Sequence, residues 1–284
     1  MTFTIGDYEV IKLLEEGSAS VVYLGKKNQK QYAIKLVENT QVAMVEGPSI
    51  HAHSVALEMR ILQDLPHPHI ITLCAVIEGS NTTALVLEFM KDGDLCDQRP
   101  GTALLRRVAQ GVAKGLRWLH RHNIVHRDIK PENILLDGTT VKLCDFGLAI
   151  DMGNHETVTS DPVGTLDFLP PEILNGRTHR GSDAWSLGAT LYDLSTGDPP
   201  FCEALCWRTP ERIQKAQYSW PSSHQDASLR NLVAGLLVLE PMLRLTMEQV
   251  LQHPWLTPPP RRVLRSGAQR SVGATPGDAR KETQ

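Results

Sequence analysis

The stretch that decides the fold is His126-Arg-Asp-Ile-Lys-Pro-Glu-Asn133, with Asp145-Phe-Gly147 beginning twelve residues after Asn133. Phosphoryl transfer needs a carboxylate to orient a hydroxyl nucleophile, oxygen ligands for Mg²⁺ and a cation near the phosphate. Asp128 can supply the carboxylate, Asn133 and Asp145 the oxygens, and Lys130 the cation. The alternative is a charged loop with a chance likeness, which an eight-residue match argues against. The motifs therefore predict phosphoryl-transfer chemistry.

Further motifs lie on both sides of this stretch in a fixed order. They are Tyr32-Ala-Ile-Lys35, Glu58 within Ala-Leu-Glu-Met-Arg, Val163-Gly-Thr165, Pro170-Pro-Glu172, Ser182 to Gly188, and Arg244. In this order they resemble the eukaryotic protein kinases over about residues 8 to 256. The resemblance implies an α+β fold of two lobes, a small antiparallel sheet with one helix and a larger, mainly helical part.

The same resemblance implies the cofactors ATP and Mg²⁺ and assigns roles to residues. Lys35 holds the α- and β-phosphates and pairs with Glu58, Asp128 and Lys130 act on the transferred group, and Asn133 and Asp145 hold the metal. The nucleotide is expected to contact Leu14, Gly17, Val22, Ala33, Lys35, Glu58, Leu87, Glu88, Met90, Asp94 and Leu135. An apolar spine linking the lobes is expected from Leu62, Leu73, His126 and Phe146.

One motif departs from the family pattern. The loop that covers the phosphates carries three glycines in the family, but Glu15-Glu-Gly17-Ser-Ala-Ser20 retains only the middle one. Glycine lets backbone N–H groups close over phosphates, and Glu15 adds a carboxylate near an anionic nucleotide. We expect a raised KM for ATP. The degraded loop also supports an alternative, a pseudokinase scaffold without turnover, and a small-molecule kinase of the same fold is a second rival.

The activation segment resembles that of serine/threonine kinases. Lys130 and Thr165 match that branch, and Gly164-Thr-Leu-Asp-Phe-Leu-Pro-Pro-Glu172 is similar to the Aurora subfamily, which implies a protein substrate with Ser or Thr. Arg127 marks kinases switched by a phosphate on this segment, and the matching position holds Asp161. An aspartate there predicts partial activation without phosphorylation. Alternatively Asp161 caps a turn, and Thr157, Thr159 or Ser160 is the switch.

Three carboxylates, on Asp94, Glu132 and Glu211, match positions where basic-directed kinases hold arginines before the target hydroxyl. Carboxylates accept paired hydrogen bonds from guanidinium groups. We therefore expect a preference for arginine two or three residues upstream, the alternative being solvated surface acids.

Composition and charge argue against several other classes of protein. The 284 residues carry a net charge of -3, which disfavours a nucleic-acid partner. No apolar run is long enough for a membrane helix, and the N-terminus lacks a signal pattern. Five scattered cysteines, without Cys-x-x-Cys, indicate neither disulfides nor zinc. We expect a monomeric protein of the cytoplasm or nucleus.

Periodicity divides the chain into 1–90, 91–256 and 257–284. The first part is predicted to hold five strands (8–14, 21–25, 32–37, 70–77, 83–89) and a helix at 54–65. The second part holds helices at 102–122, N-capped by Thr102, and at 181–195, 210–216, 227–237 and 246–251. The last part, with six basic and two acidic residues, is predicted to be a disordered basic tail. Ser266 and Ser271 in it are candidate phosphorylation sites.

Overall fold

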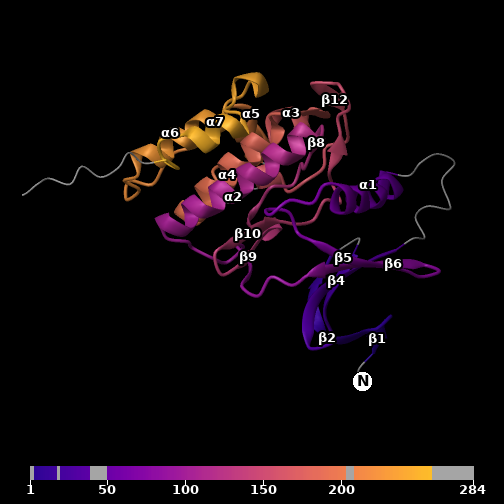
Figure 1. Ribbon diagram of the computed structural model, residues 1–284. Coiled ribbons are helices and arrows are strands. Elements are labelled where there is room, and N and C mark those ends of the chain that lie inside the picture. The colour runs from indigo at the N-terminus through magenta and orange to yellow at the C-terminus, as the bar shows by residue number, and fades with distance from the viewer. Residues whose placement is uncertain (1–2, 18–19, 39–49, 203–207, 258–284) are drawn as a thin grey trace, which may run out of the picture.

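The computed structural model describes residues 3–17, 20–38, 50–202 and 208–257. The predicted tail therefore lies outside the described residues, apart from Thr257. Two layers of unequal size are arranged one above the other (Figure 1). The smaller contains a sheet and one helix, and the larger is mostly helical, so the predicted α+β architecture is confirmed.

The small lobe is built on an antiparallel sheet in the order β1-β2-β3-β4-β6-β5. Its bounds are β1 Thr4–Ile5, β2 Tyr8–Glu16, β3 Ser20–Lys27, β4 Lys30–Glu38, β5 Leu73–Glu78 and β6 Thr82–Glu88. The prediction of five strands missed β1, a two-residue strand that pairs back onto β2 through Gly6, which has a φ of +56°. Helix α1, Ile50–Asp64, begins earlier than predicted.

The predicted strand at 70–77 is wrong in its first part, because residues 70–72 leave the sheet. Leu143 donates its N–H to the carbonyl of His69 and accepts from the N–H of Ile71, both at 2.9 Å. This segment is thus tied to the large lobe, and β5 starts only at Leu73. The connection between lobes after β6 runs through Met90, which is buried.

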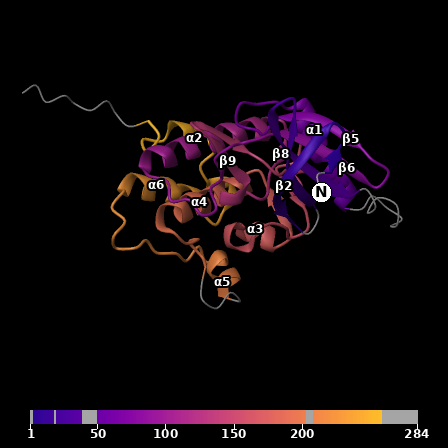
Figure 2. The same cartoon turned by 90° about the horizontal axis from the view of Figure 1, so that it is seen from below.

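The large lobe is organised around α2, Thr102–Arg121, and α4, Ser182–Thr196. Around them lie α3 Pro171–Leu174, α5 Thr209–Gln214, α6 Ala227–Leu236 and α7 Met247–Gln252, with short 3₁₀ turns η2 Pro131–Asn133, η3 Leu166–Phe168 and η5 Pro241–Leu243. Thr102 makes no cap, since the helix begins with it and Gly101 is the cap residue. Helix α5 projects away from the rest of the lobe (Figure 2).

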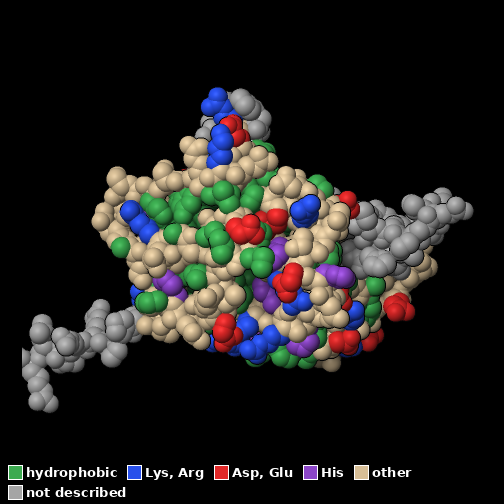
Figure 3. Space-filling view, turned by 90° about the horizontal axis from the view of Figure 1, so that it is seen from above, with side chains coloured by type: hydrophobic (Ala, Val, Ile, Leu, Met, Phe, Trp, Pro, Cys, Tyr) green, Lys and Arg blue, Asp and Glu red, His purple; other side chains and the backbone are tan. Residues whose placement is uncertain are grey.

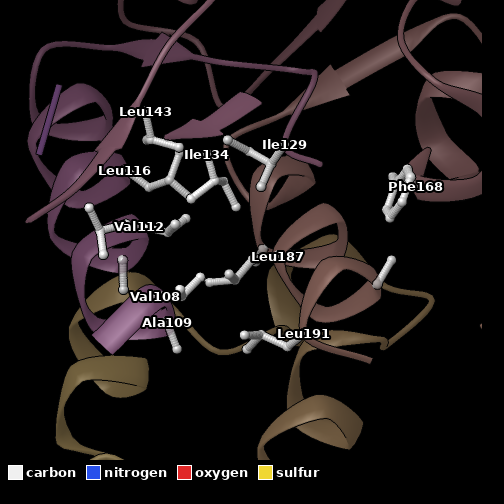
Figure 4. Packing of buried hydrophobic residues seen from close by; sticks show 14 of the residues in the cluster. Val108, Ala109, Val112, Leu116, Ile129, Ile134, Leu143, Phe168, Leu187 and Leu191 are labelled. Atoms are coloured by element: carbon white, nitrogen blue, oxygen red, sulfur yellow. The ribbon is translucent and has the colours of Figure 1, made fainter. Parts of the chain in front are cut away.

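The core of this lobe lies between α2 and α4. Val108, Val112 and Leu116 of α2 face Leu187 and Leu191 of α4, and all five are inaccessible to solvent (Figure 4). The other side of α2 approaches the strands closely. A Cβ on Gly111 would lie 2.9 Å from the Cβ of Val141, so only glycine fits there.

Short strand pairs position the loops of the site. They are β7 Gly93–Asp94, β8 Ile124–Val125, β9 Ile134–Asp137, β10 Thr140–Leu143, β11 Ile150–Asp151, β12 Thr157–Thr159 and β13 Arg177–His179. The order β10-β9-β7 forms one sheet, β11 pairs with β8, and β12 pairs with β13. None of the described helices is long and apolar enough to cross a membrane.

Candidate active site

Three polar side chains surround Asp128, those of Lys130 and Asn133 from the loop between β8 and β9 and that of Thr165 from the activation segment. Its Oδ1 accepts from the N–H and the hydroxyl of Thr165, both at 3.1 Å, and its Oδ2 accepts from Nδ2 of Asn133 at 2.8 Å. Lys130 Nζ lies 3.1 Å from the carboxylate and donates to the Thr165 hydroxyl at 2.8 Å. One hydroxyl is therefore held between a carboxylate and an ammonium group, which is the arrangement that an incoming hydroxyl nucleophile needs.

Asp183, at the start of α4, fixes the backbone of this loop. Its carboxylate is fully buried and accepts N–H groups from His126 at 3.0 Å and Arg127 at 2.9 Å, and it lies 2.7 Å from Nε2 of His120. Burial disfavours the charge, but the hydrogen bonds and the charge of His120 lower the pKa of Asp183. The carboxylate thus holds Arg127 at a φ of +68°. Asp183 belongs to the motif Ser182 to Gly188, but the sequence did not predict this role for it.

Lys35 of β4 links the two lobes. Its Nζ lies 2.7 Å from Glu58 of α1 and 2.8 Å from Oδ1 of Asp145, as a site for a polyphosphate requires. Burial alone lowers the pKa of Lys35, but the two carboxylates outweigh that effect and raise it. Burial likewise opposes ionisation of Asp145, while Lys35 lowers its pKa. Lys35 and Asp145 therefore both carry charge at neutral pH.

The donor set fits a hard divalent cation. The side chain of Asn133 makes two described hydrogen bonds, both donated by Nδ2, to the carbonyl and the carboxylate of Asp128. The amide oxygen of Asn133 is left for another partner. One oxygen of Asp145 contacts Lys35, which leaves the second available. Amide and carboxylate oxygens are the ligands that Mg²⁺ prefers, so these residues would hold the ion that accompanies a nucleotide.

The predicted adenine contacts come from both lobes. Ala33 lies opposite Leu87 on neighbouring strands, Leu87 and Met90 are buried, and Leu135 is half-buried on β9. Val22 lies opposite Glu15, and Leu14 is among the exposed hydrophobic residues. In the loop that covers the phosphates, Gly17 donates its N–H to the carbonyl of Ser20 at 2.9 Å.

The charge of Glu15 affects the pKa of Cys144. Burial raises the pKa of Cys144, and the carboxylates of Asp145 and Glu15 add to the rise. The thiol is therefore protonated at neutral pH and unreactive. It also follows that Glu15 contributes negative charge to the region in front of Asp145.

The comparison with known families agrees with this geometry. Residues 8–256 match the family described as the protein kinase domain. The chain belongs to the protein kinase family. The kinase is 33% identical over 263 residues to Aurora/IPL1-related protein kinase 2 of Caenorhabditis elegans, covering 89% of this chain and 84% of the relative.

Two other relatives are similarly distant. Aurora kinase B of Mus musculus is 33% identical over 271 residues, which is 92% of this chain and 76% of the relative. The serine/threonine-protein kinase PLK4 of Drosophila grimshawi is 32% identical over 268 residues, 89% of this chain but 34% of the relative. The kinase is a protein serine/threonine kinase, as its sequence predicts. A protein substrate, ATP and a divalent cation follow from the family.

The spine residues predicted to link the lobes of the kinase lie in one apolar cluster. Leu62, His126 and Phe146 are buried, and Leu73 packs against them half-buried. The rings of His126 and Phe146 lie 5.0 Å apart. Together with the Lys35 ion pairs, this packing joins the small lobe, the catalytic loop and the Asp145 loop into one unit.

The activation segment is held by pairing between β12 and β13. Thr157 and Thr159 are exposed, whereas the hydroxyl of Ser160 lies 2.7 Å from that of Thr178. In the described part of the chain, no ion pair within 4 Å joins Arg127 to Asp161. Arg127 donates Nε–H to the carbonyl of Leu148 at 2.6 Å. Burial lowers the pKa of Arg127, and Asp161 counters this from a longer range.

The three predicted substrate carboxylates differ in their surroundings. Asp94 accepts the N–H of Cys96 at 2.8 Å. Glu132 is exposed on the catalytic loop, while Glu211 is paired with Lys215 at 2.7 Å. The charge of Glu211 is therefore already compensated.

Sequence analysis missed an acid on α4. Asp193 of α4 is buried. Burial raises its pKa to about 6; Arg99 opposes the rise, and Glu132, Asp198 and Asp167 add to it. The signal that could have found Asp193 is an ionisable residue on a buried helix. Such residues are often functional.

A second missed feature lies at the connection between lobes. Lys142 of β10 is buried and donates to the Glu88 carboxylate, to the hydroxyl of Thr72 at 3.1 Å and to the carbonyl of Ile70 at 3.3 Å. Glu88 also accepts the N–H of Thr72 at 2.7 Å. The side chain of Glu88, assigned above to nucleotide binding, thus joins β6 to the large lobe.

Proposed function

We propose that this kinase is an Aurora-like enzyme that transfers the γ-phosphoryl group of ATP to serine or threonine hydroxyls preceded by arginine. Asp128 orients the hydroxyl, and Lys130 and Lys35 bind the phosphates. Asn133 and Asp145 would hold Mg²⁺, which supplies charge neutralisation on the phosphates. The single observation that carries the substrate preference is the group of acids at the large lobe, with Glu132 exposed on the catalytic loop and Asp193 buried on α4; Glu132, Asp198 and Asp167 add to the rise that burial causes in the pKa of Asp193.

A buried carboxylate close to other acids strongly favours the binding of a cation. A guanidinium group can pair with two carboxylates at once, and its charge remains at any physiological pH. We therefore assign the upstream arginine to Glu132 and Asp193. Glu211 is the weaker candidate because Lys215 already pairs with it. Asp94 stays a candidate at the exit from the lobe connection.

A pseudokinase scaffold is the second candidate, favoured by Glu15 in the phosphate-covering loop. The charged contacts among Lys35, Glu58 and Asp145 argue against it, because a module without turnover has no use for three charged groups placed at close range.

The test is phosphorylation of a degenerate Ser/Thr peptide library with labelled MgATP. We expect incorporation that depends on arginine two or three residues upstream, and a loss of at least about 10³-fold in Asp128→Asn. The control is Asp137→Asn, which replaces an acid at the end of β9, outside the catalytic loop. A preference for proline or acidic residues would reject the substrate class, and absence of turnover would favour the scaffold.

A further inference from the structure

A cavity of about 510 Å³ opens on the large lobe. None of the residues assigned to the nucleotide, the cation or the target hydroxyl lines it. Its walls come from the second half of α2, from β13 and from the loop that enters α7, and they include Arg117, Arg121, His179, Pro241, Met242 and Met247. Figure 3 shows the face that carries β12 and α7, where hydrophobic side chains lie beside charged and histidine side chains.

One wall of this cavity exposes a large apolar side chain. Met242 of η5 lines the cavity and is 75% exposed, and Leu243, the next residue in sequence, is 72% exposed. Exposed apolar side chains gathered at a concave site mark a binding surface, and methionine adapts its shape to different occupants.

The charged wall has more positive than negative charge. Arg117 and Arg121 share a single carboxylate, that of Glu248, at 3.1 and 3.6 Å. Arg180 is balanced by Glu156 at 3.7 Å, and Arg244 is engaged with Glu172. Within the part of the chain that the structure describes, these two arginines of α2 thus have one carboxylate between them. An occupant with a carboxylate complements this wall.

The wall also holds a hydrogen-bond donor without an acceptor. Gly181 donates its N–H to Nδ1 of His179 at 2.8 Å, so the ring proton of His179 is on Nε2. Burial lowers the pKa of His179 and keeps the ring neutral. Within the described residues Nε2 has no partner, and a buried donor without an acceptor is destabilising. This feature favours an occupant that brings oxygen acceptors.

We propose that this cavity docks a short peptide segment of a partner protein that carries a bulky apolar side chain next to a carboxylate. The apolar side chain packs between Met242 and Met247, and the carboxylate pairs with Arg117 and Arg121. The proposal is independent of the phosphorylated substrate, because the cavity shares no residue with the catalytic loop.

The probe is a displayed library of random twelve-residue peptides, selected on the full chain without nucleotide. Enriched sequences are expected to combine a large apolar residue with Asp or Glu. Synthetic copies are then measured by fluorescence anisotropy against Met242→Asp and Arg121→Glu, each expected to bind at least tenfold more weakly. The matched controls are Leu13→Asp, on an exposed apolar residue of β2, and Arg107→Glu, on an exposed residue of α2; both should stay within twofold.

Hydrogen exchange locates the bound peptide. Protection is expected in residues 177–181 and 241–248, and thermal melting of each variant shows that it is folded. The proposal is overturned if no peptide is enriched, if enriched peptides bind both variants like the parent chain, or if protection falls elsewhere. It is also overturned if sedimentation shows that the chain itself dimerises through this face and that Met242→Asp abolishes the dimer.

Discussion

Arg244 and Glu172 form a two-bonded ion pair, with distances of 2.6 and 2.7 Å between guanidinium nitrogens and carboxylate oxygens. The Arg244 side chain is fully buried, and that of Glu172 is 11% exposed. The pair connects the end of the activation segment to the loop before α7. Arg244 also donates to the carbonyls of Gly181, Val238 and Leu239.

Replacing this arginine should destabilise the large lobe. Arg244→Met leaves a buried carboxylate and three carbonyls without their donor, and we expect a loss of about 3–5 kcal/mol in the free energy of unfolding. Urea denaturation followed by circular dichroism measures it, with Arg107→Met as the surface control. A loss below about 1 kcal/mol would show that the pair contributes little.

Glu15→Gly should improve nucleotide binding. The substitution removes a negative charge from the cleft and restores a glycine to the phosphate-covering loop, so we expect the KM for ATP to fall several-fold with kcat little changed. Glu16→Gly, one residue further along β2, is the control. An ATP KM of a few micromolar that Glu15→Gly leaves unchanged would contradict the idea.

Asp193→Asn should stabilise the fold while harming substrate selection. Because the folded-state pKa of about 6 lies above the ordinary value of 3.8, the folded protein binds this proton more tightly than the unfolded chain does. Stability therefore falls as the pH rises from about 4 to about 6, and the ionised group costs up to roughly 3 kcal/mol above that range.

The variant should accordingly melt higher at pH 7.5, match the parent near pH 4, and lose selectivity for arginine-containing peptides. Asp198→Asn, on the exposed residue that follows α4, should change the melting temperature little. A lower melting temperature for Asp193→Asn at pH 7.5 would show that its charge is stabilised by partners.

Activation without phosphorylation can be measured directly. Because Asp161 acts on Arg127 without a close ion pair, we expect Asp161→Ala and Asp161→Asn to reduce phosphatase-treated activity about two- to fivefold. Thr159→Val tests the alternative that a threonine is the switch. Activity that phosphatase abolishes in the parent chain would assign control to a phosphorylated residue.

Sequence analysis found the parts of the site that are contiguous or strongly patterned. Asp128, Lys130 and Asn133 lie on one loop, and Asp145 follows from its neighbours Phe146 and Gly147. The contacts made by Asp193 and Lys142 were not predictable, because they depend on which residues distant in sequence lie beside them. Short elements were also missed, since β1 and α3 are too brief to show a period. The predicted N-cap at Thr102 is wrong because the helix already begins at Thr102, so that Gly101 is the N-cap residue. Composition does not reveal this detail of backbone geometry.

The tie between residues 69–71 and Leu143 has a mechanical consequence. Two backbone links join the lobes among their other contacts: the chain that passes Met90, and the hydrogen bonds of His69 and Ile71 with Leu143. A lobe that is attached at two points can rotate about the line through them, but the attachments resist twisting and sliding. These two links therefore favour a rocking of the small lobe about one axis over a twist or a slide whenever the nucleotide cleft opens.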